Sequence, residues 1–110
     1  MIFGKKGGMP GEIDVASFDF LKGSTEFARL WHGESDGLVA IIEPRGIGAD
    51  PAIFGMAMVD TIRHGAKAYA HAVGISEEDA IERIWAGFDA ERDNPTDTPR
   101  EIDPETGKIL

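Results

Sequence analysis

Four side chains that could hold a metal ion or move a proton recur along one segment of the chain. They are Asp60, His64, Lys67 and His71. In a helix, their spacing of four, three and four residues would place them along one narrow stripe. An Asp and a His one turn apart can bind a metal, and a paired His can act as a general base. The stripe lies opposite the segment's apolar residues, however, where a solvated row of charges is expected. We therefore predict no metal site here, and we treat Asp60, His64 and His71, together with Arg63, as a candidate ligand or partner surface.

The second candidate is the pair Trp31-His32, near the end of a predicted strand. An aromatic ring beside a histidine can form the rim of a ligand site, although a Trp in a strand more often belongs to the core. The sequence contains no phosphate-binding loop, no dinucleotide fingerprint, no G-x-S-x-G elbow and no H-E-x-x-H pair. Cysteine is absent, which excludes a thiolate nucleophile and a disulfide framework. The sequence thus nominates no catalytic residue and no cofactor.

The charge balance limits the partners. The 110 residues carry 20 acidic and 11 basic side chains, a net charge of −9, and most of the excess lies after residue 75. An acidic surface repels phosphate backbones and anionic lipids, so we expect neither nucleic acid nor a membrane as a partner. No apolar run approaches the ~18 residues of a membrane span, and the start has no apolar leader segment. We expect a cytoplasmic protein.

The composition divides the chain into three parts. Residues 1–12 are rich in glycine and are expected to be flexible, 13–93 form a single domain, and 94–110 form a proline-rich acidic tail. Ile13–Leu21 is either a short helix, capped by Asp14 and ended by Gly23, or an extended arm, and periodicity does not decide between them. In the tail, the Asp-Pro-Glu-Thr-Gly turn predicts a small hairpin between Ile102 and Ile109, which matters only if it docks.

A β-hairpin is predicted at the start of the domain. Glu26–His32 alternates in polarity, and the apolar run Leu38–Ile42 is rich in β-branched residues. Gly33–Gly37 has the composition of a hairpin loop, and Pro44 ends the second strand. Because that strand is apolar on both faces, we expect it to be covered on both sides or to lie centrally in a sheet.

Two helices follow the hairpin. Asp50 caps the first, Pro51 suits its first position, and the helix runs to Val73 with Gly74 as its C-cap. Ser76 caps the second helix, which fades near Asp93 before Pro95. The first helix has one predicted buried face, comprising Phe54, Met58, Ile62, Ala66, Tyr69 and Val73.

Three expectations concern the surroundings of the first helix. Gly55 and Gly65 lie on its buried side, which suggests another backbone passing close by. Ile53 and Met56 point away from that side, so a partner or the N-terminal segment must cover them. Arg63, at the edge of the charged stripe, is placed to pair with an acid of the second helix.

These elements predict an α+β domain, in which an antiparallel hairpin-based sheet packs on two helices, one long and one shorter. A lone hairpin is marginal in water, and a domain this small buries little of its surface, so the surplus of apolar residues predicts a homodimer. The alternative is that Ile13–Leu21 or the tail closes the sheet within one chain.

Several short motifs carry a resemblance to a known family. They include Leu30-Trp31, Gly37-Leu38-Val39, Asp50-Pro51 with Gly55, Val59-Asp60, Arg63-His64, Ala68-Tyr69, Phe88-Asp89-Ala90-Glu91 and Pro95-Thr96-Asp97. Over roughly Phe27–Pro99 the chain resembles a family of short proteobacterial proteins known as a domain of unknown function. The resemblance implies a stand-alone bacterial domain and brings no catalytic residue, substrate or cofactor.

Two functions remain open at this point. The first is a non-enzymatic interaction or regulatory protein that acts as a homodimer and has room for a protein partner. The second is a small-ligand-binding protein or minor enzyme whose pocket lies at the dimer seam, around Trp31, His32, Arg63 and His64.

Overall fold

The structure, a computed structural model, describes residue 9, residues 11–35 and residues 37–110. Its elements in chain order are the short 3-10 helix η1 (Asp19–Leu21), strands β1 (Ala28–His32) and β2 (Leu38–Ile42), the 3-10 helix η2 (Pro44–Gly46), and helices α1 (Pro51–Val73) and α2 (Glu77–Asp93). This arrangement confirms the α+β layout. The predicted flexible start, residues 1–12, lies mostly outside the described residues.

Both helices begin and end where the sequence predicts. The Asp50 side chain accepts a hydrogen bond from the Ala52 amide at 3.0 Å, and Gly74 closes α1 in the left-handed conformation, with φ of 81°. At the start of α2, the Ser76 hydroxyl accepts a hydrogen bond from the Asp79 amide at 3.0 Å. These caps satisfy backbone groups that have no partner inside the helix, which is why such residues mark helix ends reliably.

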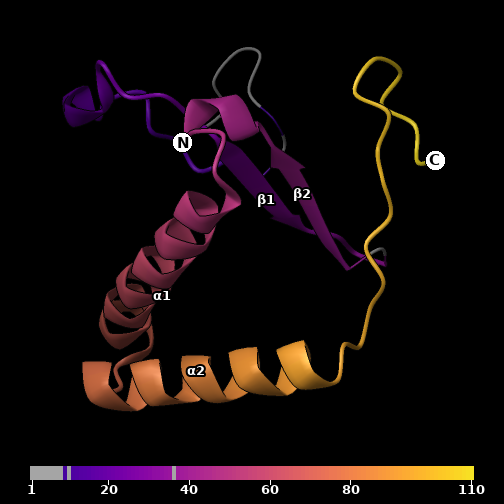
Figure 1. The fold of residues 1–110 in the computed structure, drawn as a ribbon. Coiled ribbons are helices and arrows are strands. Elements are labelled where there is room, and N and C mark those ends of the chain that lie inside the picture. Colours follow the sequence, from indigo (N-terminus) through magenta and orange to yellow (C-terminus); the bar gives the residue numbers. More distant parts are fainter. Residues whose placement is uncertain (1–8, 10, 36) are drawn as a thin grey trace.

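The two helices lie at a steep angle to each other (Figure 1). The most buried side chains of the described residues belong to them. Ala66 of α1 and Ala80 of α2 are each only 2% exposed. The prediction that Tyr69 is buried is wrong, since this residue is 56% exposed. The reason is the crossing angle: α2 covers a small patch around Ala66 and leaves the neighbouring part of the apolar face open.

The glycines of α1 do not mark a close backbone. A Cβ added to Gly65 would meet only the Ile84 Cδ1 atom, at an ordinary 3.8 Å, and a Cβ on Gly55 would meet nothing within 4 Å. The predicted passage of another backbone beside these glycines is therefore wrong within the described chain. The contact at Gly65 is made by the side chain of Ile84 in α2.

The hairpin has the predicted position and loop. Its strands pair antiparallel with Ala28 opposite Ile42 and His32 opposite Leu38, so β1 starts two residues later than the predicted Glu26. The Gly33 amide donates to the Gly37 carbonyl at 2.6 Å, and Gly37 takes φ of 73°, which a residue with a side chain rarely adopts. The loop residue types therefore set the hairpin register.

The described residues cover both faces of the hairpin only in part, with Ala28, Trp31 and Val39 half-buried. Leu30 and Leu38, on one face, are 56% and 63% exposed, and Ile41, on the other, is 48% exposed. The link to α1 is made at the base, where the rings of Phe27 and Phe54 meet edge to face at 6.3 Å. Because α1 leaves this base in a different direction, the sheet does not lie flat on the helices (Figure 1). Among the described residues, β2 is therefore neither fully covered on both sides nor central in a sheet, contrary to the expectation.

The segment Ile13–Leu21 is neither a regular helix nor a strand. Asp14 forms a local turn by accepting a hydrogen bond from the Ala16 amide at 3.0 Å, and only Asp19–Leu21 is helical, as a single 3-10 turn. Phe18 and Phe20 stack on each other at 5.5 Å, yet Phe20 remains 78% exposed. The segment therefore adds no strand to the sheet. The tail, the other candidate for closing the sheet within one chain, forms its bridge between its own residues Ile102 and Ile109.

The tail contains the predicted small hairpin. Ile102 and Ile109 form an antiparallel bridge, and the Asp103 amide donates to the Lys108 carbonyl at 2.9 Å. Ile109 and Leu110 are 52% and 69% exposed. Across the described part of the chain, no helix is long and apolar enough to cross a membrane.

Candidate functional site

The charged stripe of α1 is open to solvent. His64 Nε2 lies 3.4 Å from Asp60 Oδ2, and the two side chains are 77% and 68% exposed. An exposed pair of this kind contributes little to stability, because water screens the charges. The described residues contain no group of three or more His, Asp or Glu side chains that could hold a metal ion. Asp60 and His64 therefore lie on a solvent-exposed surface of α1.

Lys67, not Arg63, joins the two helices. Its Nζ atom lies 3.1 Å from Glu77 Oε2 and 3.3 Å from Glu77 Oε1. Arg63 makes no ion pair with any residue that the structure describes. The expected pairing of Arg63 is thus wrong, because Lys67 lies closer to the start of α2. His71 lies in the last turn of α1, where the helix dipole favours a positive charge.

Trp31 and His32 do not form one rim. They are consecutive in β1, so their side chains point to opposite faces of the hairpin, with Trp31 half-buried and His32 exposed. The six residues singled out from the sequence therefore fall into two groups, two at the loop end of the hairpin and four along α1. Figure 1 shows α1 leaving the opposite end of the hairpin, so the fold does not bring the groups together.

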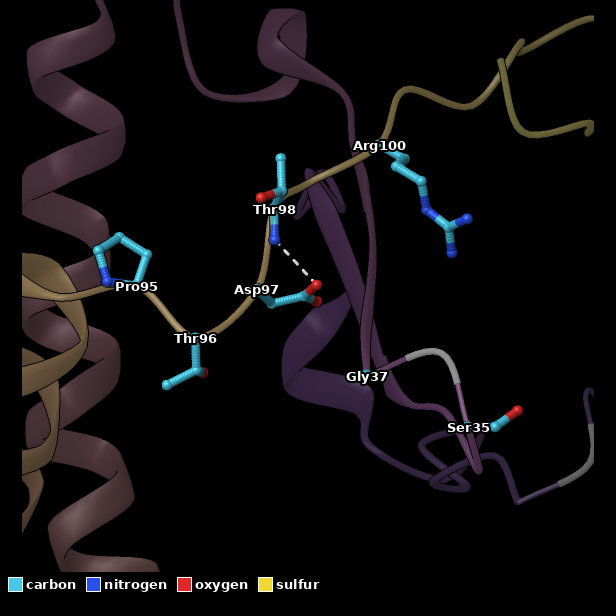
Figure 2. A pocket seen from close by; sticks show the side chains of 7 residues that line it. All are labelled: Ser35, Gly37, Pro95, Thr96, Asp97, Thr98 and Arg100. Carbon is cyan, nitrogen blue, oxygen red and sulfur yellow. Dashed lines mark hydrogen bonds between the residues drawn. The ribbon is translucent and has the colours of Figure 1, made fainter.

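A pocket of about 790 Å³ lies where the tail passes the hairpin loop (Figure 2). It is open to solvent and lined by Ser35, Gly37, Pro95, Thr96, Asp97, Thr98 and Arg100. Gly37 lets the tail approach, since a Cβ there would lie 3.0 Å from Asp97 Oδ2. The hydroxyls and the opposite charges of Asp97 and Arg100 suit a small polar ligand.

The tail near this pocket is held by local hydrogen bonds. The Thr96 amide donates to Glu91 Oε2 at 2.7 Å, which ties the tail back to the last turns of α2. The Thr98 amide donates to Asp97 Oδ1 at 2.8 Å. Sequence reasoning did not select these residues, although Pro95-Thr96-Asp97 was among the motifs of the family resemblance. That motif was the available signal, and only the fold shows that it meets the hairpin loop.

Two ion pairs flank the base of the hairpin. Arg45 donates to Glu43 through its Nε and Nη2 atoms at 2.9 and 2.6 Å, and these bonds lower the pKa of the Glu43 carboxyl to about 2. Before β1, the hydrogen bond from Arg29 Nε to Glu26 Oε2 at 2.8 Å lowers the pKa of Glu26. Both carboxylates are therefore ionised over the physiological range and are satisfied locally, which suits a structural role.

The largest unusual feature is apolar. We use the term hairpin surface for Leu30, Leu38, Ile41 and Ile42, which are between 38% and 63% exposed. Ile53 and Met56 of α1, which the sequence predicted to need cover, are 40% and 67% exposed. Leu30, Leu38 and Ile42 lie on one face of the hairpin and Ile41 lies on the other, so the exposed apolar side chains are divided between two faces. These side chains make up an apolar surface that the described residues of one chain leave open.

Comparison with known proteins identifies the family. A model of DUF5076, a domain of unknown function, matches residues 19–96. The chain belongs to the DUF5076 family. The match confirms the resemblance found in the sequence and extends it toward the N-terminus to include η1. The DUF5076 domain of this chain thus contains the hairpin and both helices.

A solved structure resembles nearly the whole DUF5076 chain. It is described as that of "a putative pyruvate dehydrogenase from the photosynthetic bacterium Rhodopseudomonas palustrus", and it is 27% identical with a TM-score of 0.59. The alignment covers 94% of this chain and 98% of that one, so the two chains have nearly equal lengths. No curated protein matches this DUF5076 chain.

Proposed function

We propose that this DUF5076 protein is a non-enzymatic interaction protein of the bacterial cytoplasm that acts as a homodimer. The observation that carries the proposal is the amount of surface that one chain leaves open. The chain exposes 9424 Å², whereas a compact monomer of this mass would expose about 6,000 Å². Its radius of gyration is 16.0 Å, against about 13 Å for a compact chain of this length.

The open surface is apolar at several places. Leu38, Met56 and Phe20 are each more than 60% exposed, and they come from the hairpin, α1 and the segment before β1. An obligate dimer interface removes roughly 1,000–2,500 Å² from each partner, which the surplus of this chain can supply. A second copy of this chain is present wherever the chain is made, and it exposes the same apolar side chains.

The bacterial setting is supported by the bacterial source of the solved neighbour. The net charge of −9 suits a protein that must stay dispersed while carrying an apolar interface. A further protein partner would bind the surface that the dimer leaves open, including the charged stripe of α1.

The proposal is tested by the mass of the protein in solution. Sedimentation equilibrium of the untagged chain is expected to give twice the chain mass at micromolar concentration. Met56→Glu places a charge on the exposed apolar side of α1, and we expect it to weaken the dimer at least tenfold. Ala68→Glu adds the same charge to an exposed position elsewhere on α1 and is the matched control. A folded wild-type monomer at all concentrations would refute the homodimer.

A second candidate function, binding of a small carboxylate, is favoured by one combination of observations. The neighbour described as a pyruvate dehydrogenase shares the fold, and the pocket between the hairpin loop and the tail carries Arg100 among hydroxyl groups. Arg pairs well with carboxylates. This pocket would replace the seam around Trp31, His32, Arg63 and His64 as the ligand site.

Titration with pyruvate separates the two functions. If the second is right, pyruvate raises the melting temperature of the wild type and of Arg63→Gln, but not that of Arg100→Gln. The absence of any shift at millimolar pyruvate would count against it. The same titration with a neutral analogue, acetone, controls for nonspecific effects of the additive.

A further inference from the structure

The hydrogen bonds at the two ends of the hairpin fix which backbone groups point outward. The Gly33 amide donates to the Gly37 carbonyl at 2.6 Å, and the Glu43 amide donates to the Phe27 carbonyl at 2.8 Å. In an antiparallel pair, residues alternate between positions that exchange hydrogen bonds and positions that do not. By this alternation, Arg29 opposite Ile41 and Trp31 opposite Val39 are the pairs whose backbone N–H and C=O groups point toward the other strand of the hairpin.

The remaining residues of β2 turn their backbone away from β1. These are Leu38, Ala40 and Ile42, opposite His32, Leu30 and Ala28. The sheet has two strands, so this outer edge of β2 has no neighbouring strand among the residues that the structure describes. Their N–H and C=O groups form a regular row that can accept another strand.

The edge of β2 carries none of the usual protection against pairing. Edge strands are normally blunted by charged side chains, proline or a bulge. The five residues of β2 are Leu, Val, Ala, Ile and Ile, and the continuous register shows no bulge. The edge of β1 differs, since Arg29 and His32 belong to that strand. The two edges of the hairpin are therefore not equivalent.

We propose that β2 of a second copy pairs antiparallel with β2 across a two-fold axis at Ala40, which makes a continuous four-stranded sheet. The inference rests on the proposed homodimer and names its interface. Leu38 then lies opposite Ile42 of the second copy, and Ala40 opposite Ala40, all on one face. Val39 lies opposite Ile41 on the other face. Every cross-strand pair is apolar, and such pairs stabilise sheets.

The charge distribution favours this self-pairing. Two chains with a net charge of −9 repel each other, but β2 itself carries no charged residue, so the axis lies at the least charged strand. A two-fold axis also needs a surface that is complementary to itself, and an antiparallel strand edge meets this condition. The small Ala40 side chain lets the two central residues lie directly opposite each other.

The test uses proline at matched positions on the two edges. Ala40→Pro removes an outward amide of β2 and leaves the hydrogen bonds between β1 and β2 intact. Leu30→Pro does the same for β1, at the residue directly opposite. We expect Ala40→Pro to weaken dimerisation at least a hundredfold in sedimentation equilibrium, while Leu30→Pro stays dimeric. Far-UV circular dichroism confirms that both variants keep their helices.

A second measurement needs no variant. In a dimer of mixed isotope labelling, the proposed register gives an NMR contact between the Hα atoms of Val39 in one copy and Ile41 in the other. It also slows hydrogen exchange at the Ala40 amide, whereas the Leu30 amide exchanges rapidly. Fast exchange at Ala40 in a dimeric sample would overturn the proposal, even if both proline variants dissociate.

The outcomes distinguish this inference from the proposed function. A dimer that Met56→Glu disrupts and Ala40→Pro does not would refute the β2 interface and leave the homodimer standing. A monomeric wild type would remove both. Dissociation by Ala40→Pro and not by its matched control Leu30→Pro, together with the contact between Val39 and Ile41, would establish the interface.

Discussion

The helix pair and the hairpin of this protein differ in how complete they are. The helices have caps at both starts, an ion pair between Lys67 and Glu77, and buried alanines where they cross. The hairpin has the predicted loop and register, but Leu30, Leu38 and Ile41 on its two faces remain between 48% and 63% exposed. Local sequence signals specify both elements. Among the described residues, only the helix pair contains side chains that are almost completely buried, Ala66 and Ala80. An element can thus be locally well specified and still depend on a partner for burial.

The largest expected effect concerns the helix pair, where side chains are buried within one chain. Ala66→Leu adds volume at the crossing of α1 and α2, where Ala66 is 2% exposed. We expect the free energy of unfolding to fall by about 1–3 kcal/mol, because a packed position has no room for the larger side chain. Urea unfolding followed by circular dichroism measures it. Ala68→Leu, at an exposed position two residues away, should change the free energy by less than about 0.5 kcal/mol. Equal effects of the two variants would mean that the crossing is not tightly packed.

The next effect concerns the hairpin, where apolar side chains are exposed in one chain. Leu38→Ser removes an apolar side chain that is 63% exposed in one chain, so it should barely affect a monomer. In a dimer that buries this residue, it should cost about 1–2 kcal/mol per chain. Thermal melting at a high and a low protein concentration separates the cases, since only dimer stability depends on concentration. Leu110→Ser changes a leucine of similar exposure, 69%, outside the hairpin. A loss that is independent of concentration would argue against burial by a second copy.

A smaller, stabilising effect tests how closely the helices pack. A Cβ on Gly65 would make ordinary contact with Ile84 Cδ1 at 3.8 Å, so alanine fits there. Gly65→Ala should raise the free energy of unfolding by about 0.5–1 kcal/mol, because alanine restricts the unfolded chain and favours the helix. Chemical denaturation provides the measurement. A destabilised Gly65→Ala would reveal that α2 lies closer to α1 than the structure places it.

The smallest effect concerns pH and the base of the hairpin. Bonds from Arg45 lower the pKa of Glu43 from its ordinary 4.5 to about 2. The folded chain thus releases this proton more readily than the unfolded chain, so the stabilisation is present above about pH 4.5 and disappears as the pH falls toward 2. Glu43→Gln should therefore reduce stability slightly at neutral pH and not at all near pH 2. Melting curves across this range measure the difference, with Glu34→Gln in the exposed loop as the control.

Much of the local structure was predictable because short-range physics decides it. Asp50, Pro51 and Gly74 bound α1, and Ser76 begins α2, since unpaired backbone groups at helix ends need these residue types. The turn between Ile102 and Ile109 was predictable because proline fixes φ at Pro104 and Gly107 adopts a positive φ of 73°. The candidate site was less predictable. Its six residues lie in two separate groups, and the pocket is built from a loop and a tail whose meeting no periodicity announces.

The misplaced expectations share one cause. Tyr69 was placed on the apolar face correctly, yet it is exposed, because burial depends on where α2 crosses. Arg63 and Lys67 were both within reach of α2, and the position of the helix start selected Lys67. Helix periodicity gives the direction of a side chain, but it does not state which element lies in that direction.

The sequence by itself determined the bounds of both helices and of β2, because each of these boundaries follows from the conformational limits of a few neighbouring residues. It also determined that the chain carries more apolar side chains than two helices and one hairpin can bury. Only the tertiary structure decided that α2 lies at a steep angle to α1, that α1 leaves the hairpin base, and that β2 has no second neighbouring strand among the described residues. Those features depend on packing between residues far apart in the chain, which local conformational preferences do not specify.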